Sequence, residues 1–134
     1  ANADGIPTSG IISFKPGRYE GGGMRFLRFM RWLKEIHEAV DVTECYFEEV
    51  RRHQGVDAAH VYGGFLAQLT AFCEDNNIPY QGIPVGTIKK HATGKGNAGK
   101  DLMIQAAVDK GFAPADDNEA DALALLDYVV TQLQ

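Results

Sequence analysis

The amino-acid sequence predicts a single α/β domain, and two observations support this class. Segments with helical spacing of apolar residues alternate with short runs of β-branched and aromatic residues, as is typical of α/β proteins. The chain has 134 residues, of which 45% are hydrophobic and 23% charged, which is the size and composition of one folded domain. We therefore expect residues 1–134 to form one domain around a partly parallel sheet.

The first expected elements are a strand and an amphipathic helix. Residues 8–14 (TSGIISF) follow the turn signal Asp4-Gly5 and have the composition of the second arm of a hairpin. A glycine-rich stretch then breaks the pattern, and apolar residues recur at helical spacing from Met24 to Val40. Four cations lie largely on the other side of this helix: Arg25, Arg28, Arg31 and Lys34.

The rest of the chain continues the alternation. Residues 42–50 (VTECYFEEV) form a nearly unbroken β-friendly run, which predicts a strand buried on both faces. The elements expected after it are a helix over 58–76, a strand over 78–83, a short helix over 85–91, a helix over 100–110 and a final helix over 118–133.

Composition also limits the location and partners of the protein. No apolar run reaches the roughly 18 residues that a membrane span needs, and the first residues are no signal peptide, so a soluble, cytoplasmic protein is expected. Cys45 and Cys73 stand outside any Cys-x-x-Cys pattern, which predicts buried free thiols. The net charge of −5 disfavours bulk attraction to nucleic acid but permits a local basic patch.

Two acidic features could carry chemistry. Glu48 and Glu49 stand at the carboxyl end of the expected central strand, where ligand sites of α/β sheets gather, and at most one of them can face a given site. A solvated strand end is the simpler interpretation. Asp121 follows an acidic turn, which would cap a helix, yet it shares a helix face with Asn118 and Leu125.

A carboxylate on such a face is costly to bury without a partner. Together, Glu48 and Asp121 could hold Mg²⁺ or Mn²⁺, because hard cations take oxygen ligands. Two such ions can stabilise both the attacking and the leaving oxygen of phosphodiester cleavage. Neither residue indicates this chemistry alone.

A third feature is a lysine-rich, glycine-rich stretch, which predicts a phosphate-contacting loop or, more simply, a solvated loop. Its cations are Lys89, Lys90, Lys95 and Lys100. Residues 94–100 (GKGNAGK) also have the spacing of a nucleotide-binding P-loop. Against that alternative, Asp101 stands where Ser or Thr would hold Mg²⁺, and no clear buried strand precedes the loop.

In this order, the three features resemble the RuvC family of Holliday-junction resolvases, within the RNase H-like nuclease superfamily. The matching segments are Tyr46-Phe47-Glu48-Glu49, then Ile88-Lys89, then residues 93–100 (TGKGNAGK), then residues 118–124 (NEADALA). The last motif is the most specific, because it places a carboxylate at one fixed helical step in an Ala/Leu-rich turn. The resemblance covers the chain from about Gly10 to its end.

The resemblance implies an RNase H-like mixed sheet flanked by helices and a metal-dependent endonuclease that cuts four-way DNA junctions, as a homodimer. It implies Glu48 and Asp121 as catalytic metal ligands, with two divalent cations activating water. Asn118 stands where the family often has Asp and would be the third catalytic residue. If Asn118 does not complete the metal site, the alternatives are Asp116, Asp117 and Glu119. Lys89 and Lys100 match lysines near the scissile phosphate and the DNA backbone, and Lys90 and Lys95 lie beside them.

The start of the chain departs from the family. The family opens with a central strand ending in Leu-Asp, whose Asp bridges both metals, whereas Ala1 already stands at the turn of the following hairpin. We therefore expect the first central strand to be missing here, leaving this polypeptide inactive by itself. Two further alternatives remain: an RNase H-like domain that binds nucleic acid or a partner without cutting, and a small NTPase built on the P-loop spacing.

Overall fold

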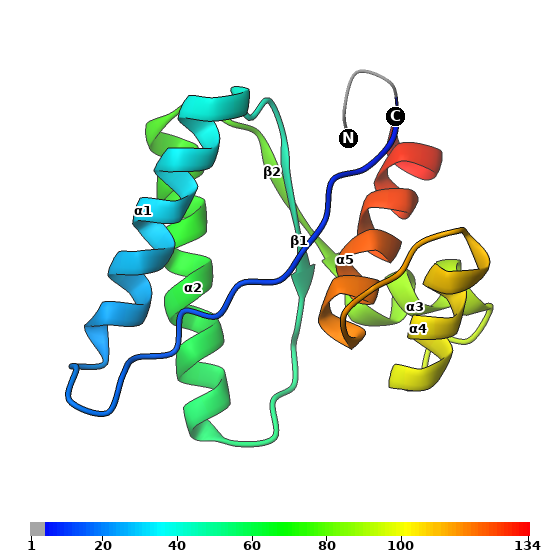
Figure 1. Ribbon diagram of the computed structural model, residues 1–134, viewed down its shortest axis with the longest axis horizontal. Helices are drawn as coiled ribbons and strands as arrows, with labels where there is room; N and C mark the ends of the chain where they lie inside the picture. The colour runs from blue at the N-terminus through cyan, green and yellow to red at the C-terminus, as the bar shows by residue number, and fades with distance from the viewer. Residues whose placement is uncertain (1–4) are drawn as a thin grey trace. The chain divides into compact units, whose positions relative to one another are not determined.

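The computed structural model describes residues 5–134 and has an α/β fold, as predicted. Its elements are labelled in Figure 1. In chain order they are α1 (Gly23–Val40), β1 (Cys45–Glu49), α2 (Val56–Asp75), β2 (Tyr80–Pro84), α3 (Val85–Thr93), α4 (Lys100–Asp109), α5 (Asp117–Tyr128) and the short π-helix η1 (Val129–Leu133). Each predicted helix therefore forms, with its ends displaced by a few residues at most.

The chain divides into two compact units. The first, here called the helical unit, comprises residues 13–45 and 51–81, with α1 and α2. The second, called the site unit, comprises residues 5–12, 46–50 and 82–134, with α3, α4, α5 and η1.

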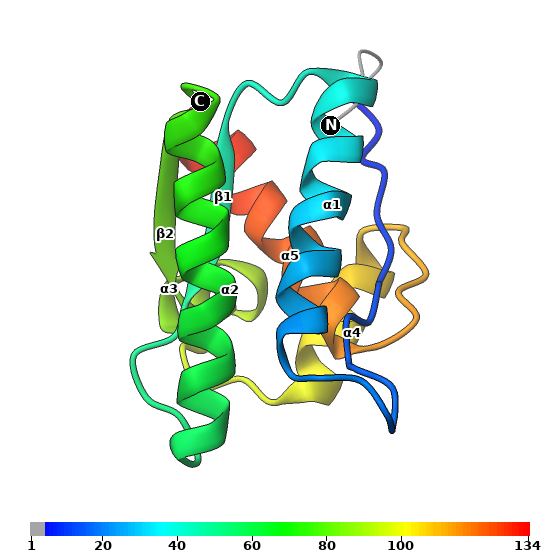
Figure 2. The same ribbon diagram turned by 90° about the vertical axis from the view of Figure 1, so that its left-hand side faces the viewer.

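In the helical unit, α1 lies beside α2 (Figure 2). Aromatic side chains fill the contact between the two helices. The ring of Phe65 on α2 meets the rings of Phe26 and Phe29 on α1, with centroids 5.2 and 5.0 Å apart. The helices approach closely because Gly64 has no side chain, and a Cβ there would overlap the Phe26 ring. Leu27, by contrast, points away from this contact and is 39% exposed.

The two cysteines lie together in the helical unit as free thiols, as predicted. Cys73 is 1% exposed, and Cys45 is half-buried and hydrogen-bonded to it. Burial is the main cause that raises the pKa of the Cys45 thiol to about 12. Both sulfurs therefore stay protonated, and packing is their role.

The site unit has its own hydrophobic core, to which its three α-helices and β2 all contribute. Met103 of α4 is its largest fully buried side chain. The buried members are Ile83, Ile88, Ala98, Met103, Ala107, Ala120 and Leu123. Small residues recur in this set, so the helices pack closely around the side chains of Ile88 and Met103.

The sheet differs from the expectation. In residues 5–134 it has two strands, β1 and β2, and they run parallel, so it is not the mixed sheet that was expected. The strand β1 is half-buried along its whole length rather than buried on both faces. Gly82 of β2 leaves room for the ring of Phe47, which stands 2.8 Å from the place of a Cβ.

The predicted strand over residues 8–14 does not form. Ile11 and Ile12 are 57% and 53% exposed in an extended segment that pairs with no strand among residues 5–134. The prediction was wrong because β-branched composition favours a strand only where a neighbouring strand takes up its hydrogen bonds. Asp4 of the predicted turn lies outside the described residues, while Gly5 has the positive φ of +80° that such turns use.

Among residues 5–134, no helix combines the length and the apolar character that crossing a bilayer requires.

Candidate functional site

Folding brings Glu48 and Asp121 within electrostatic reach of each other. Glu48 stands near the end of β1 and Asp121 in the second turn of α5, and both belong to the site unit. Both side chains are half-buried. Burial, opposed by the charge of Lys89, raises the pKa of Glu48; burial and then the charge of Glu48 raise the pKa of Asp121 to about 6. Two negative groups are thus held where their charges disfavour each other.

Lys89 joins these carboxylates from a third element, α3. Its charge lowers the pKa of both Glu48 and Asp121, although burial outweighs it at each. Lys89 is half-buried, in contrast to the exposed Lys90 beside it. Three elements, β1, α3 and α5, therefore each contribute one charged side chain to this cluster.

Asp116 and Glu119 serve the start of α5 instead. The Glu119 N–H donates to Asp116 Oδ1 at 2.9 Å, which makes Asp116 the N-cap. Glu119 is 9% exposed; its Oε1 accepts the Ala115 N–H at 2.9 Å, and its Oε2 accepts the Ser9 hydroxyl at 2.8 Å. This Asp-x-x-Glu pattern is a variant of the capping box, a signal already present in the sequence.

Two of the polar candidates around Asp121 remain accessible. Asn118 is exposed one helical turn before Asp121. Asp117 is half-buried, and its charge contributes to the raised pKa of Asp121. The charge of Asp116 also raises the pKa of Asp121, but by less. The Asp116 side chain is held by its hydrogen bond to the Glu119 N–H.

The lysine-rich loop is ordered by Thr93. The Thr93 hydroxyl donates to the Lys89 carbonyl at 2.9 Å and accepts the Lys95 N–H at 3.1 Å. Gly94 ends α3 with a φ of +82°, which favours glycine. Three lysines are exposed on and around this loop: Lys90, Lys95 and Lys100.

The same loop excludes the P-loop alternative. A P-loop joins a strand to a helix, whereas residues 94–99 join helix α3 to helix α4. The spacing of glycines and lysine in GKGNAGK is therefore coincidental, and an NTPase built on it is wrong.

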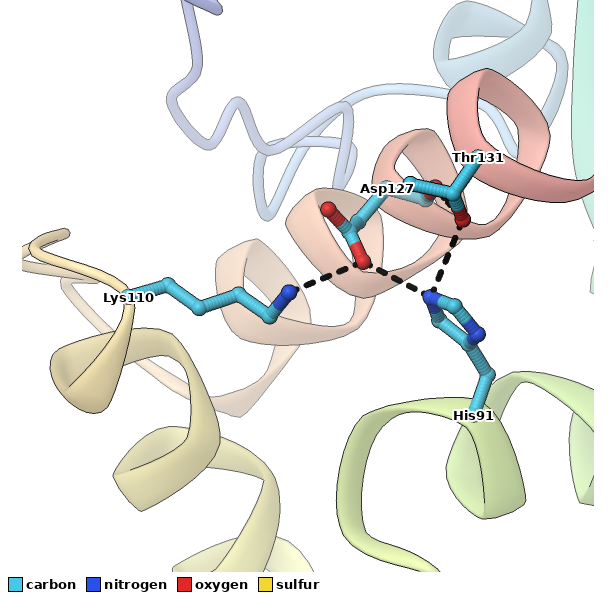
Figure 3. Close-up of polar contacts among 4 residues, drawn as sticks. All are labelled: His91, Lys110, Asp127 and Thr131. Atoms are coloured by element: carbon cyan, nitrogen blue, oxygen red, sulfur yellow. Dashed lines mark hydrogen bonds and ion pairs between the residues drawn. The ribbon is translucent and has the colours of Figure 1, made fainter. Parts of the chain in front are cut away.

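A polar cluster that the sequence did not predict links α3, α5 and the end of α4 (Figure 3). His91 Nε2 lies 2.7 Å from Asp127 Oδ2, and Lys110 Nζ donates to the same oxygen at 3.0 Å. Thr131 Oγ1 lies 3.5 Å from the same His91 nitrogen. A Ser/Thr-His-Asp triad needs the carboxylate and the hydroxyl on different ring nitrogens, so this cluster is no triad.

The donor chemistry at Glu48 and Asp121 fits a hard divalent cation in part. Half-buried carboxylates that disfavour each other's charge are the oxygen ligands that Mg²⁺ and Mn²⁺ take. In the described part of the chain, however, no group of three or more His, Cys, Asp or Glu side chains could hold a metal. The two carboxylates would thus supply only part of a coordination shell.

Comparisons with known proteins find relatives that share one name. No family model matches the chain. The crossover junction endodeoxyribonuclease RuvC of Synechococcus sp. (strain CC9311) is 31% identical over 122 residues, which cover 87% of this chain and 72% of that protein. The protein of the same name from Anaeromyxobacter sp. (strain Fw109-5) is 30% identical over 121 residues, covering 90% of this chain and 58% of the relative.

Solved structures share the fold. The structure of T. thermophilus RuvC in complex with Holliday junction substrate matches with a TM-score of 0.71 at 20% identity, over 84% of this chain and 70% of that one. A second Thermus thermophilus RuvC structure matches with a TM-score of 0.63, also at 20% identity, over 83% of this chain and 69% of that one. At this identity the likeness concerns the arrangement of the backbone.

Proposed function

Because this chain belongs to the RuvC family, we propose that it is a metal-dependent endodeoxyribonuclease that cuts four-way DNA junctions. The observation that carries the proposal is the electrostatic coupling of Glu48 with Asp121, two carboxylates far apart in sequence and half-buried in one unit. Carboxylates whose pKa is raised by burial and by a neighbouring charge cluster at functional sites, which supports the proposal. The junction-bound RuvC structure with the same fold supports the choice of substrate.

In this proposal Glu48 and Asp121 hold Mg²⁺ or Mn²⁺, and Asn118 adds a polar contact one turn earlier on α5. The bound cation would supply charge neutralisation and a water of lowered pKa. Lys89, whose charge already acts on both carboxylates, balances the charge of the scissile phosphate. The exposed Lys90, Lys95 and Lys100 bind backbone phosphates on either side.

A homodimer is part of the proposal. A four-way junction has two equivalent strands to cut, and a two-fold enzyme presents one site to each. Sedimentation of the protein with and without junction DNA tests this, and a monomer on the junction at saturation would contradict it.

The function is tested by removing one carboxylate charge at a time. Glu48→Gln and Asp121→Asn, each made in the full-length protein, are expected to abolish Mg²⁺-dependent cleavage of a synthetic four-way junction, while gel-shift binding of the junction survives. Glu49→Gln is the matched control, because the neighbouring residue of a strand points to the other face, and it should leave cleavage within a few-fold of wild type. Undiminished cleavage by both site variants would remove the proposal.

A second candidate is a RuvC-like domain that binds branched DNA without cutting it. It is favoured by Asn118 in place of a carboxylate and by the absence of a three-residue metal group among residues 5–134. Calorimetric titration with Mn²⁺ separates the two candidates. Heat of binding that disappears in Asp121→Asn supports the nuclease, and no heat in the wild-type protein supports the non-cleaving domain.

A further inference from the structure

One segment of the helical unit is strongly basic although the chain as a whole is acidic. Residues 15–34 carry six cations and a single carboxylate, Glu20, which is a local charge of +5 in a chain of net charge −5. The first acidic residue of α1 is Glu35, so the helix carries only positive charges from Gly23 to Lys34. The six cations are Lys15, Arg18, Arg25, Arg28, Arg31 and Lys34.

These cations are available to a partner. Lys15, Arg18, Arg31 and Lys34 are exposed, and Arg25 is half-buried. The apolar side of α1 is occupied by its contact with α2, in which Phe26 and Phe29 meet Phe65, so the cations occupy the remaining sides of the helix. In Figure 2, α1 lies beside α2 along its length.

The fold itself does not account for this charge. Arg28 pairs with Glu20, whose other oxygen accepts the Gly17 N–H at 2.6 Å, and this pair closes the loop before α1. In the described part of the chain no carboxylate pairs with Arg25, Arg31 or Lys34. Cations in the first turns of a helix also oppose its dipole, and the N-cap Gly22 offers no side-chain cap in compensation.

An exposed aromatic residue stands within the same segment. The side chain of Tyr19 is 91% exposed, and the Arg18 guanidinium lies 5.5 Å from the centre of its ring. An isolated exposed tyrosine is unremarkable, but cations interleaved with an exposed ring are typical of surfaces that bind nucleic acid.

We propose that residues 15–34 form a DNA-binding surface of their own, which takes the phosphate backbone of a duplex arm. This rests on the proposed function and adds a contact outside the Glu48–Asp121 cluster, in the other compact unit. The partner is a polyanion because the recognition elements are closely spaced cations, and duplex DNA presents such a charge along its whole length. Binding there releases condensed counterions, so affinity depends on salt.

The test measures salt dependence with the purified protein and a fluorescent four-way junction. The triple variant Arg25→Gln, Arg31→Gln, Lys34→Gln should reduce the slope of log K against log salt concentration by about 2 to 3, since each phosphate contact contributes about 0.9. Arg28 is left in place because it closes the loop with Glu20. The matched control is Arg25→Lys, Arg31→Lys, which keeps the charges and should keep the wild-type slope.

Further readouts separate this surface from the catalytic proposal. The triple variant should melt at the wild-type temperature and still cleave at saturating protein in low salt, whereas Glu48→Gln should keep the full slope and lose cleavage. An unchanged slope in a folded triple variant overturns the surface, even if cleavage is observed. If the wild-type protein cleaves no branched DNA and the triple variant still shows a reduced slope, the nuclease proposal is overturned and the proposed surface stands.

The proposal also predicts that residues 15–34 do not bind a lipid membrane. Vesicles of phosphatidylserine are the control polyanion. The wild type could bind these vesicles and the triple variant lose that binding while its salt slope on DNA stays unchanged. This result would mean that the segment binds a membrane surface and would overturn the DNA assignment.

Discussion

The imidazole of His91 on α3 lies 2.7 Å from the carboxylate of Asp127 on α5. Each partner shares its helix with a member of the candidate site: Lys89 is two residues before His91, and Asp121 is six residues before Asp127. The contact, drawn in Figure 3, therefore ties α3 to α5, which are the helices that carry Lys89 and Asp121.

Replacing Asp127 should weaken the fold in a pH-dependent way. Burial raises the pKa of Asp127, but hydrogen bonds from His91 and Lys110 outweigh it and hold that pKa below its usual value of 3.8. The ionised form thus adds stability above about pH 4, which is lost as the pH falls through the lowered pKa. Asp127→Asn should lower the free energy of unfolding by about 1 to 2 kcal/mol at pH 7 and by little near pH 3.

Urea denaturation at both pH values measures this difference. Lys110→Ala is the control, because the Lys110 side chain is 49% exposed and its pair with Asp127 should contribute under about 0.5 kcal/mol. An equal loss in both variants, or a loss for Asp127→Asn that persists at pH 3, would assign the effect to packing instead.

Removing the charge of Asp121 should stabilise the metal-free protein. Burial and the charge of Glu48 raise its pKa to about 6, so the folded state binds this proton more tightly than the unfolded chain does. Its ionisation therefore destabilises the fold above pH 6, and the effect fades as the pH falls towards the usual 3.8.

Melting with EDTA at pH 8 should consequently give a higher Tm for Asp121→Asn than for the wild type, and the difference should vanish near pH 4. Added Mg²⁺ should raise the Tm of the wild type alone, because only the intact pair binds it. A wild type that melts at or above the variant in EDTA at pH 8 contradicts the electrostatic account.

Two neighbouring glycines of α2 should respond in opposite ways to alanine. Gly63 is exposed with nothing within 4 Å of a Cβ, so Gly63→Ala should stabilise the protein by about 0.5 to 1 kcal/mol through helix propensity. At Gly64 a Cβ would overlap the Phe26 ring, so Gly64→Ala should destabilise it by about 1 to 3 kcal/mol. Thermal or chemical denaturation of the two variants tests the packing of α1 on α2, and a shift of the same sign in both would refute it.

The N-cap of α5 should affect stability without affecting chemistry. Asp116→Ala removes the acceptor for the Glu119 N–H and should lower the free energy of unfolding by about 1 kcal/mol. Asp116→Asn retains a capping oxygen and should restore most of this. Both variants should keep junction cleavage; loss of cleavage in a stable Asp116→Asn would instead make Asp116 a metal ligand.

Local patterns determined most of the secondary structure. The apolar spacing from Met24 to Val40 predicted α1 almost to its ends, because one face of a helix must meet the core wherever the helix lies. The acidic turn before the last helix likewise indicated a cap, and the structure assigns that cap to Asp116. Residues 8–14 were predicted wrongly, since a strand is completed by a neighbour that no local pattern supplies.

The sequence by itself also indicated the family, through the order of its motifs, and relatives about 30% identical confirm it. Only the tertiary structure decided which charges meet. Glu48 and Asp121, and likewise His91 and Asp127, lie on different elements, and the 36 residues that separate the second pair leave no periodic trace of the contact. Electrostatic and hydrogen-bond energies depend on distance in space, and that distance is set by the packing of helices around Ile88 and Met103.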